Sequence, residues 1–297
     1  MGSGVSYPSI KFMSDYKDNN ELFDDVKKVS RELIENKYEE TIKKTLKNYV
    51  DFISVMIDSI EQSNSRQSPK AVNLFTTNYD LFVEKSVDSL LNNKRFVFND
   101  GANGYFVRTL DSSNYNKTTS YKGLNDNFLD EIVTINLFKP HGSVNWERNG
   151  NHIIVKNEVS DNFVGVPPTG VENSETFIND HFHNMLRLFQ FELDKQQSLL
   201  IVIGFSFQDS HIAAMVKRAL KNPELLVIVF CHDEKTDKDG KTEKDRIYEN
   251  LDVPNNQNNL MVVVPSEIDT NDGEKIKEFI IANLTELILN NKETDCE

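Results

Sequence analysis

His141 stands on a tight glycine turn directly after an apolar run at residues 132–138. In the local sequence Lys-Pro-His-Gly-Ser, Pro140 stiffens the approach to the turn, and Gly142 permits a backbone conformation closed to other residues. An imidazole fixed in this way suits general-base chemistry near neutral pH. The alternative is a turn histidine whose ring satisfies a backbone carbonyl, and spacing alone gives that alternative at least equal weight.

A second apolar run, at residues 72–75, leads into the polar sequence Thr-Thr-Asn-Tyr-Asp at residues 76–80. Asn78 and Asp80 supply one carboxamide and one carboxylate, which are suited to binding a ribose or a carboxamide ligand in a cleft. The alternative for Asp80 is the N-cap of a helix that begins at Leu81, and both roles are compatible for different atoms.

A third apolar run, at residues 199–203, leads into Gly-Phe-Ser at residues 204–206. Its backbone amides and hydroxyl are candidates to approach a phosphate or ribose at the N-terminus of the following helix. The alternative is that Asp209 or Ser210 simply caps this helix, which does not exclude the binding role. A glycine-rich segment, Gly-Ser-Gly-Val-Ser at residues 2–6, is of the type that lets backbone approach a pyrophosphate, and its alternative is a remnant of cloning.

The apolar runs that carry these residues lack the alternation of a half-exposed strand, so they predict strands buried on both faces. They lie at residues 71–76, 132–138, 199–205, 225–231 and 260–264. Segments with helical spacing lie at residues 21–37, 38–62, 81–92, 176–197, 211–221 and 274–290. Strands that alternate with helices predict an α/β fold with a Rossmann-like, doubly wound parallel sheet. Because the carboxyl ends of such strands meet at one edge, we expect the polar segments to converge on one pocket.

The 297 residues are expected to form one domain. Residues 18–66 would form a helical lid or subdomain, and residues 99–127, rich in Asn, Gly, Ser, Thr and Tyr, an irregular insertion or β-hairpin beside the site. Residues 233–245 mix both charge signs at high density and predict a solvated loop.

The composition excludes several classes of function. A net charge of −14 disfavours direct capture of nucleic acid, because that affinity comes mostly from phosphate neutralisation. Two cysteines, Cys231 and Cys296, are too few for a disulfide framework or a four-thiolate zinc site. His181 and His183 lie two apart on a predicted helix and so point to different faces, and we predict no metal. No run is long enough to cross a bilayer and no targeting segment is evident, so we expect no membrane association and a cytoplasmic location.

Taken in order, the glycine segment, residues 76–80, residues 139–143 and residues 203–212 resemble the motifs of sirtuin-like domains, in particular the divergent bacterial branch used in antiphage defence. The resemblance spans nearly the whole chain. It implies that NAD is the substrate and that the residues binding it are Gly2, Gly4, Ser6, Thr77, Gly142, Gly204 and Ser206. It also implies that His141 is the catalytic base, that Asn78 positions the ribose or a water, and that Asp80 contacts the carboxamide.

The resemblance implies an NAD⁺ hydrolase that releases nicotinamide and ADP-ribose and acts as a defence effector by depleting NAD. Its control would come from a sensor partner, such as an ATPase or an Argonaute-like protein. A homo-oligomer is expected if the apolar faces of residues 38–62 are exposed, unless they pack on the sheet. One alternative is an NAD-dependent protein deacylase or ADP-ribosyltransferase, which the absent zinc cysteines oppose. A further alternative is a non-catalytic module that senses NAD or ADP-ribose.

Overall fold

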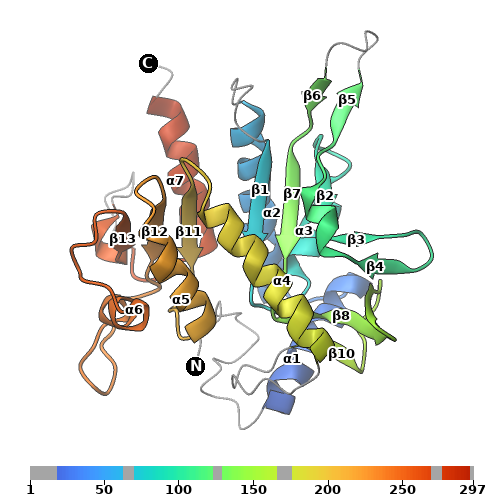
Figure 1. Ribbon diagram of the computed structural model, residues 1–297, viewed down its shortest axis with the longest axis horizontal. Helices are drawn as coiled ribbons and strands as arrows, with labels where there is room; N and C mark the ends of the chain where they lie inside the picture. Colours follow the sequence, from blue (N-terminus) through green and yellow to red (C-terminus); the bar gives the residue numbers. More distant parts are fainter. Residues whose placement is uncertain (1–18, 63–69, 123–128, 166–175, 269–275, 295–297) are drawn as a thin grey trace.

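The computed structural model describes residues 19–62, 70–122, 129–165, 176–268 and 276–294 and has an α/β architecture with parallel sheets (Figure 1). One parallel sheet has the order β1-β7-β2 and a second has the order β11-β12-β13. Their strands are β1 (Ala71–Phe75), β7 (Thr134–Phe138), β2 (Val97–Asn99), β11 (Leu199–Ile203), β12 (Leu226–Phe230) and β13 (Leu260–Val263). The five strands predicted from the apolar runs are present, but the second sheet is not buried on both faces, because Leu199, Leu226 and Met261 are exposed. Strand β2 was not predicted.

Helices cover both faces of these sheets, which confirms the Rossmann-like, doubly wound arrangement. The helices are α1 (Asn19–Glu35), α2 (Glu40–Glu61), α3 (Phe82–Leu90), α4 (Thr176–Leu193), α5 (Ser210–Ala219), α6 (Glu243–Leu251) and α7 (Ile281–Thr294). The largest apolar cluster joins α1, α2 and α3 to one face of β1 and β7, and α4 packs on the opposite face. In the second sheet, α4, α5 and α6 pack on one face and α7 on the other.

The apolar face of α2 packs within the chain. Ile42, Leu46, Ile53 and Ile57 are buried in the same cluster as Val87 of α3. The helix also packs along α7. Of the two alternatives for residues 38–62, the structure therefore shows packing inside the molecule, and this face is not available to a second copy.

A third sheet is antiparallel and lies beside the carboxyl end of β7. Its order is β10-β8-β9-β4-β3. Its strands are β8 (Gly142–Asn149), β9 (His152–Val155), β10 (Phe163–Gly165), β4 (Arg108–Leu110) and β3 (Ala102–Asn103). Trp146 is the largest member of its small apolar core. The β3–β4 hairpin projects from the right-hand side of Figure 1. A 3-10 helix, η2 (Ser112–Asn116), and a hairpin of β5 (Ser120–Lys122) and β6 (Leu129–Glu131) complete this region.

Two expectations about helices were wrong in detail. Helix α6 begins at Glu243, inside the stretch expected to be a loop, because Thr242 and Asp245 form a reciprocal capping box at its N-terminus. Helix α7 begins at Ile281 and not at residue 274. The backbone N–H of Phe279 donates to the carbonyl oxygen of His232 at 2.7 Å, which ties the preceding residues to the end of β12 instead of to a helical turn.

Three asparagines form a ladder of side-chain amides across the first parallel sheet. Asn73, Asn136 and Asn99 are register partners on β1, β7 and β2. The Asn99 amide donates to Asn136 at 2.9 Å, and the Asn136 amide donates to Asn73 at 2.8 Å. The ladder ends on α4, where the Asn73 amide donates to Glu192 at 2.8 Å. These bonds satisfy the buried amide of Asn136, which would otherwise be costly inside a sheet, and the partly buried amides of Asn73 and Asn99.

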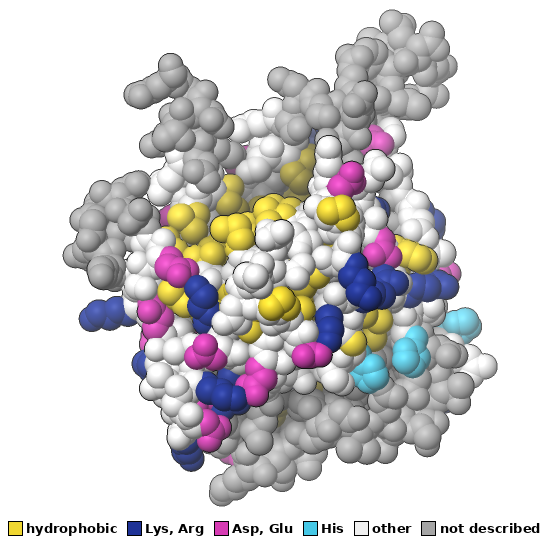
Figure 2. Space-filling view, turned by 60° about the vertical axis from the view of Figure 1, so that its left-hand side comes forward, with side chains coloured by type: hydrophobic (Ala, Val, Ile, Leu, Met, Phe, Trp, Pro, Cys, Tyr) yellow, Lys and Arg dark blue, Asp and Glu magenta, His cyan; other side chains and the backbone are white. Residues whose placement is uncertain are grey.

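The surface carries both charge signs. On the face seen in Figure 2, acidic and basic side chains are interspersed below a group of apolar side chains. None of the described helices combines the length and the apolar character needed to cross a bilayer.

Candidate functional site

The imidazole of His141 pairs with the carboxylate of Asp209. His141 follows β7, and Asp209 precedes α5 at the end of the segment that follows β11. The His141 Nε2 atom lies 3.0 Å from Asp209 Oδ2, and both side chains are largely buried. The loops after β7 and β11 therefore meet, although these strands belong to different hydrogen-bonded sheets.

Asp209 is also the N-cap of α5, as the sequence allowed. Its Oδ1 atom accepts the backbone N–H groups of His211 at 2.9 Å and Ile212 at 3.2 Å. Burial alone would raise the pKa of Asp209, but the hydrogen bonds from His141 and these N–H groups lower it overall. The carboxylate is therefore held ionised, with one oxygen on the helix and the other on the imidazole.

Gly142 has the backbone conformation that the sequence predicts for it. Its φ is +95°, and a Cβ atom at this position would lie 2.2 Å from the carbonyl oxygen of Val164 on β10. The glycine thus allows both the turn and the close approach of β10. It starts β8 immediately after His141, so the imidazole sits at the junction between the parallel and antiparallel sheets.

The segment of Thr77, Asn78 and Asp80 lies between β1 and α3. Asp80 is buried, and its Oδ1 atom accepts the N–H of Phe82, the first residue of α3, at 3.0 Å, although the N-cap position itself is Leu81 and not Asp80. The helix begins at Phe82 and not at Leu81. The Asn78 N–H donates to Oγ1 of Thr76 at 3.1 Å, which tightens the turn.

A buried lysine joins this segment to the histidine turn. Lys139 is only 2% exposed, and its ammonium group bonds to the backbone carbonyl of Asp80, to Ser143 Oγ at 3.0 Å and to Glu84 Oε1 at 2.7 Å. Burial raises the pKa of Glu84, and the Lys139 charge opposes that shift. A backbone bond from the Val144 N–H to the Tyr79 carbonyl, at 3.0 Å, supports the same junction. The ends of β1 and β7 are therefore fixed to each other.

Gly204 and Ser206 complete the group of strand ends. Gly204 has φ of +65° immediately after β11. Ser206 is buried; its carbonyl accepts the side-chain amide of Asn250 at 2.7 Å, while its Oγ atom has no hydrogen-bond partner among the described residues. A buried hydroxyl without a partner is unusual and fits a position that bonds to a ligand.

The structure therefore brings together residues from all three predicted strand ends, as expected for one edge of a doubly wound sheet. The predicted phosphate-binding residues Gly2, Gly4 and Ser6 lie outside the described residues.

His181 on α4 lies beside the site. The sequence alone gives no reason to place this histidine there. Its ring lies edge to face on Trp146, with centroids 5.2 Å apart. Burial lowers the pKa of His181 to about 4, against an opposing hydrogen bond with the backbone of Lys139. Its Nε2 atom is buried and has no partner among the described side chains. The spacing to His183 argued against a metal pair, but no local pattern predicts contact with the turn that carries His141.

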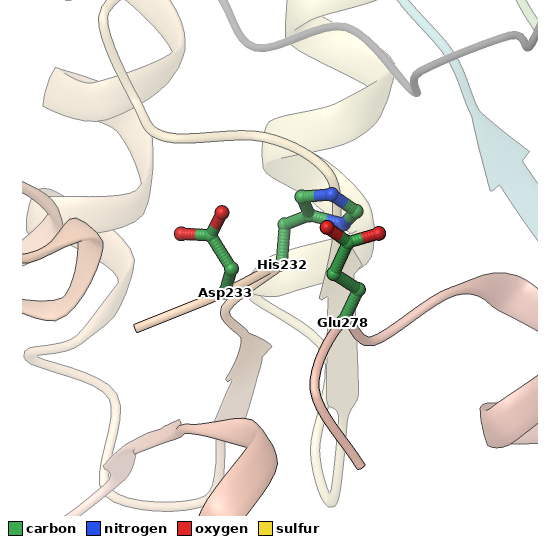
Figure 3. A group of neighbouring side chains, drawn as sticks. All are labelled: His232, Asp233 and Glu278. Atoms are coloured by element: carbon green, nitrogen blue, oxygen red, sulfur yellow. The ribbon is translucent and has the colours of Figure 1, made fainter. Parts of the chain in front are cut away.

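A separate cluster of His232, Asp233 and Glu278 has ligand atoms within 4.8 Å of one another (Figure 3). The Lys235 ammonium lies 3.0 Å from Asp233 and 3.2 Å from Glu278, so one cation already pairs with both carboxylates. The His232 Nδ1 atom bonds to the carbonyl of Phe279 at 3.1 Å. This arrangement is a largely exposed ion-pair network at the end of β12.

A hollow of about 520 Å³ lies along α6, away from the strand-end site. It is lined by Lys241, Asp245, Tyr248, Glu249, Asp252, Val253, Pro254 and Asn255. None of these residues belongs to the predicted site. Lys241 and Glu249 pair across it at 2.7 Å. We therefore place the candidate site at the three strand ends, where the buried polar groups are concentrated.

Comparison with protein-family models matches residues 72–251 to the SIR2-like domain. The match covers more than half of the 297 residues and includes the three strand ends. None of the curated proteins gives a match to the chain.

Proposed function

We propose, from the premise that this chain belongs to the SIR2-like family, that it is an NAD⁺ hydrolase that releases nicotinamide and ADP-ribose. SIR2-like domains use NAD as their substrate. The observation that carries the proposal is the pairing of His141 with the ionised Asp209, next to the Asn78 and Asp80 segment.

The pair gives His141 a defined tautomer. Because the Asp209 carboxylate only accepts hydrogen bonds, the Nε2 atom carries the proton between them and Nδ1 carries the lone pair. Asp209 thus orients the imidazole and stabilises the cation that forms when Nδ1 accepts a proton. In other enzymes, a carboxylate that is hydrogen-bonded to a histidine supports general-base catalysis by that histidine in the same way.

The proposed reaction breaks the bond between nicotinamide and the ribose C1′ atom. Nicotinamide leaves with the bonding electron pair as a neutral molecule, and the ribose becomes oxocarbenium-like. A water oxygen then bonds to C1′, and His141 takes the proton from that water directly or through a ribose hydroxyl. Asn78 and Asp80 would hold the nicotinamide and ribose half in this scheme, and the hydroxyl of Ser206 would bind the adenosine half.

The rigid junction of loops supports this assignment. Lys139 bonds to the carbonyl of Asp80 and to Ser143 on the far side of the turn, which fixes His141 relative to Asn78. Holding reactants in a fixed geometry removes much of the entropic barrier to reaction. Hydrolysis is favoured over transfer to a peptide because the sequence lacks the zinc cysteines that accompany the peptide cleft in classical deacetylases.

We further propose that the activity serves a bacterial antiphage defence system by depleting NAD, under the control of a sensor partner such as an ATPase or an Argonaute-like protein. The support for this role is the ordered set of motifs and not the geometry of the site. Because NAD loss is lethal, a regulated assembly is expected. Phage challenge of cells carrying wild type or His141→Ala, with cellular NAD followed over time, tests this role separately from the chemistry.

The test of the chemistry is incubation of the purified protein with NAD and chromatographic separation of the products. Wild type should release nicotinamide and ADP-ribose in equal amounts, and His141→Ala should lower the rate by about a hundred- to ten-thousand-fold. His152→Ala, at an exposed position on β9, is the matched control and should keep full activity. NAD binding without turnover would favour the sensing module, and product formation only with an acyl-peptide or a protein acceptor would favour the transferase alternative.

A further inference from the structure

The tip of the β3–β4 hairpin carries three consecutive apolar side chains that no described part of the chain covers. Tyr105 is 88% exposed, Phe106 is 94% exposed and Val107 is 56% exposed. The two aromatic rings lie edge to face with centroids 4.8 Å apart. Contiguous exposed aromatic side chains are typical of protein interaction sites, where such residues often supply the main anchors.

The base of this hairpin is rigid. Arg108 bonds to both carboxylate oxygens of Asp100 at 2.8 Å, and the Tyr115 hydroxyl bonds to the Asp100 carbonyl at 2.8 Å. At the start of the tip, Gly104 has φ of +129°, and a Cβ atom there would lie 2.0 Å from the carbonyl oxygen of Val107. The tip is therefore held away from the body of the molecule instead of folding back onto it.

An exposed aliphatic surface lies on the second parallel sheet. Leu199 and Leu226 are register partners, 57% and 37% exposed, and Met261 is 50% exposed. Met261 pairs with Ile228, two residues along from Leu226, so the three exposed side chains share one face. Helix α7 packs on the carboxyl half of that face, and within the described segments the amino half stays exposed. Leucine and methionine side chains form an apolar surface on which aromatic rings can pack.

We propose that the hairpin tip of one molecule docks on this aliphatic surface of a second copy of the same chain. The hairpin and the β11–β13 sheet lie on opposite sides of the molecule, so the contact has to join two copies head to tail (Figure 1). Such a heterologous contact leaves one tip and one acceptor unused at the ends, so it generates a ring or a filament. The net charge of −14 disfavours an anionic lipid surface as the partner of the tip.

The expected junction is weak by itself. A standard interface buries about 800 Å² on each partner. A buried aromatic side chain contributes about 150–250 Å², so the three residues of the tip supply only part of that area. Assembly should therefore depend on concentration and gain strength when a ring closes, because the last junction is intramolecular.

Sedimentation velocity of the full chain over a range of concentrations tests the proposal. The mean mass of wild type should rise with concentration, and this rise should disappear in Tyr105→Ser/Phe106→Ser and in Leu199→Lys/Met261→Lys. Tyr121→Ser, at another exposed aromatic residue on β5, is the matched control and should assemble like wild type. All these positions are exposed, so melting temperatures should remain unchanged and confirm that each variant folds.

Mixing the two assembly-deficient variants gives the sharper result. One retains an intact acceptor and the other an intact tip, so together they should form pairs of two molecules and nothing larger. Wild type that stays monomeric at all concentrations, or assembly that survives either double variant, would overturn the proposal. So would binding of wild type, but not the tip variant, to phosphatidylserine vesicles, because the tip would then be a lipid anchor.

Discussion

The side chains of His141 and Asp209 connect two parallel sheets that share no backbone ladder. Their 3.0 Å contact links the turn after β7 to the N-cap of α5. The same aspartate holds the helix with its other oxygen. A change at either residue therefore affects proton transfer and the alignment of the two strand ends together.

Replacing Asp209 by asparagine should separate these two effects. Asparagine also caps helices well, so the melting temperature should change little. The imidazole would lose its ionised partner and its fixed tautomer, so we expect NAD turnover to fall by about a hundred-fold or more. Initial rates of nicotinamide release provide the measurement, with Asp194→Asn, a surface partner of Arg218, as the control. Full activity in Asp209→Asn alongside an inactive His141→Ala would show that the base works without the pair.

Lys139→Met should destabilise the protein strongly. The substitution roughly keeps the length of the side chain but leaves the Glu84 carboxylate, which is 23% exposed, without its cation. Breaking such a pair from one side typically costs about 3–5 kcal/mol. Urea unfolding at neutral pH should reveal this loss, and Glu84→Gln in the Lys139→Met background should recover part of it. If the double variant were no more stable than the single one, the ion pair would not be the source of the effect.

Gly142→Ala should cost more stability than Gly150→Ala. Both glycines have positive φ, +95° and +61°. A Cβ atom at residue 150 meets nothing within 4 Å, whereas one at residue 142 collides with the carbonyl oxygen of Val164. We expect about 1 kcal/mol for Gly150→Ala and clearly more for Gly142→Ala. Equal melting temperatures for the two variants would contradict the close approach of β10 to the histidine turn.

His181 should make the fold sensitive to mild acid. Its pKa in the folded protein is lowered to about 4 from an ordinary value of 6.5, so folding favours the neutral ring. Its contribution is complete above pH 6.5 and is lost as the pH falls toward 4, which amounts to about 2 kcal/mol between pH 7 and pH 5. In His181→Asn, which cannot gain a proton, the urea midpoint should change less between these pH values. His183→Asn, at an exposed position on the same helix, should retain the wild-type dependence.

The sequence predicts five of the six parallel strands because their segments are rich in apolar residues, whereas β2 has only three residues. It did not predict β8, although Ser143, Val144, Asn145 and Trp146 alternate between polar and apolar residues as a half-exposed strand does. The polar members of this strand are in fact buried, because Ser143 and Asn145 bond to each other at 2.8 Å within the Lys139 network. Tertiary hydrogen bonds therefore reverse the environment that the pattern alone indicates.

The candidate site was predictable in its parts but not in its pairings. His141 and Asp209 were both identified, one as a base and the other as a helix cap, yet they lie 68 residues apart and no local rule joins them. The sequence indicates Lys139 only as part of the motif around His141, and a lysine in a turn is usually exposed to solvent. Its burial follows from Glu84 on α3, which only the packing of that helix against the sheet reveals.

The amide ladder of Asn73, Asn136 and Asn99 has a consequence for errors in strand alignment. A slip of β7 by one residue would remove Asn136 from both partners and turn its amide toward the opposite face of the sheet. Each wrong alignment would then leave several polar side-chain atoms without hydrogen-bond partners at once. The ladder therefore favours a single register. The loops after β1 and β7 start three residues beyond Asn73 and Asn136, so the relative position of the two loops along the strands is set before any ligand binds.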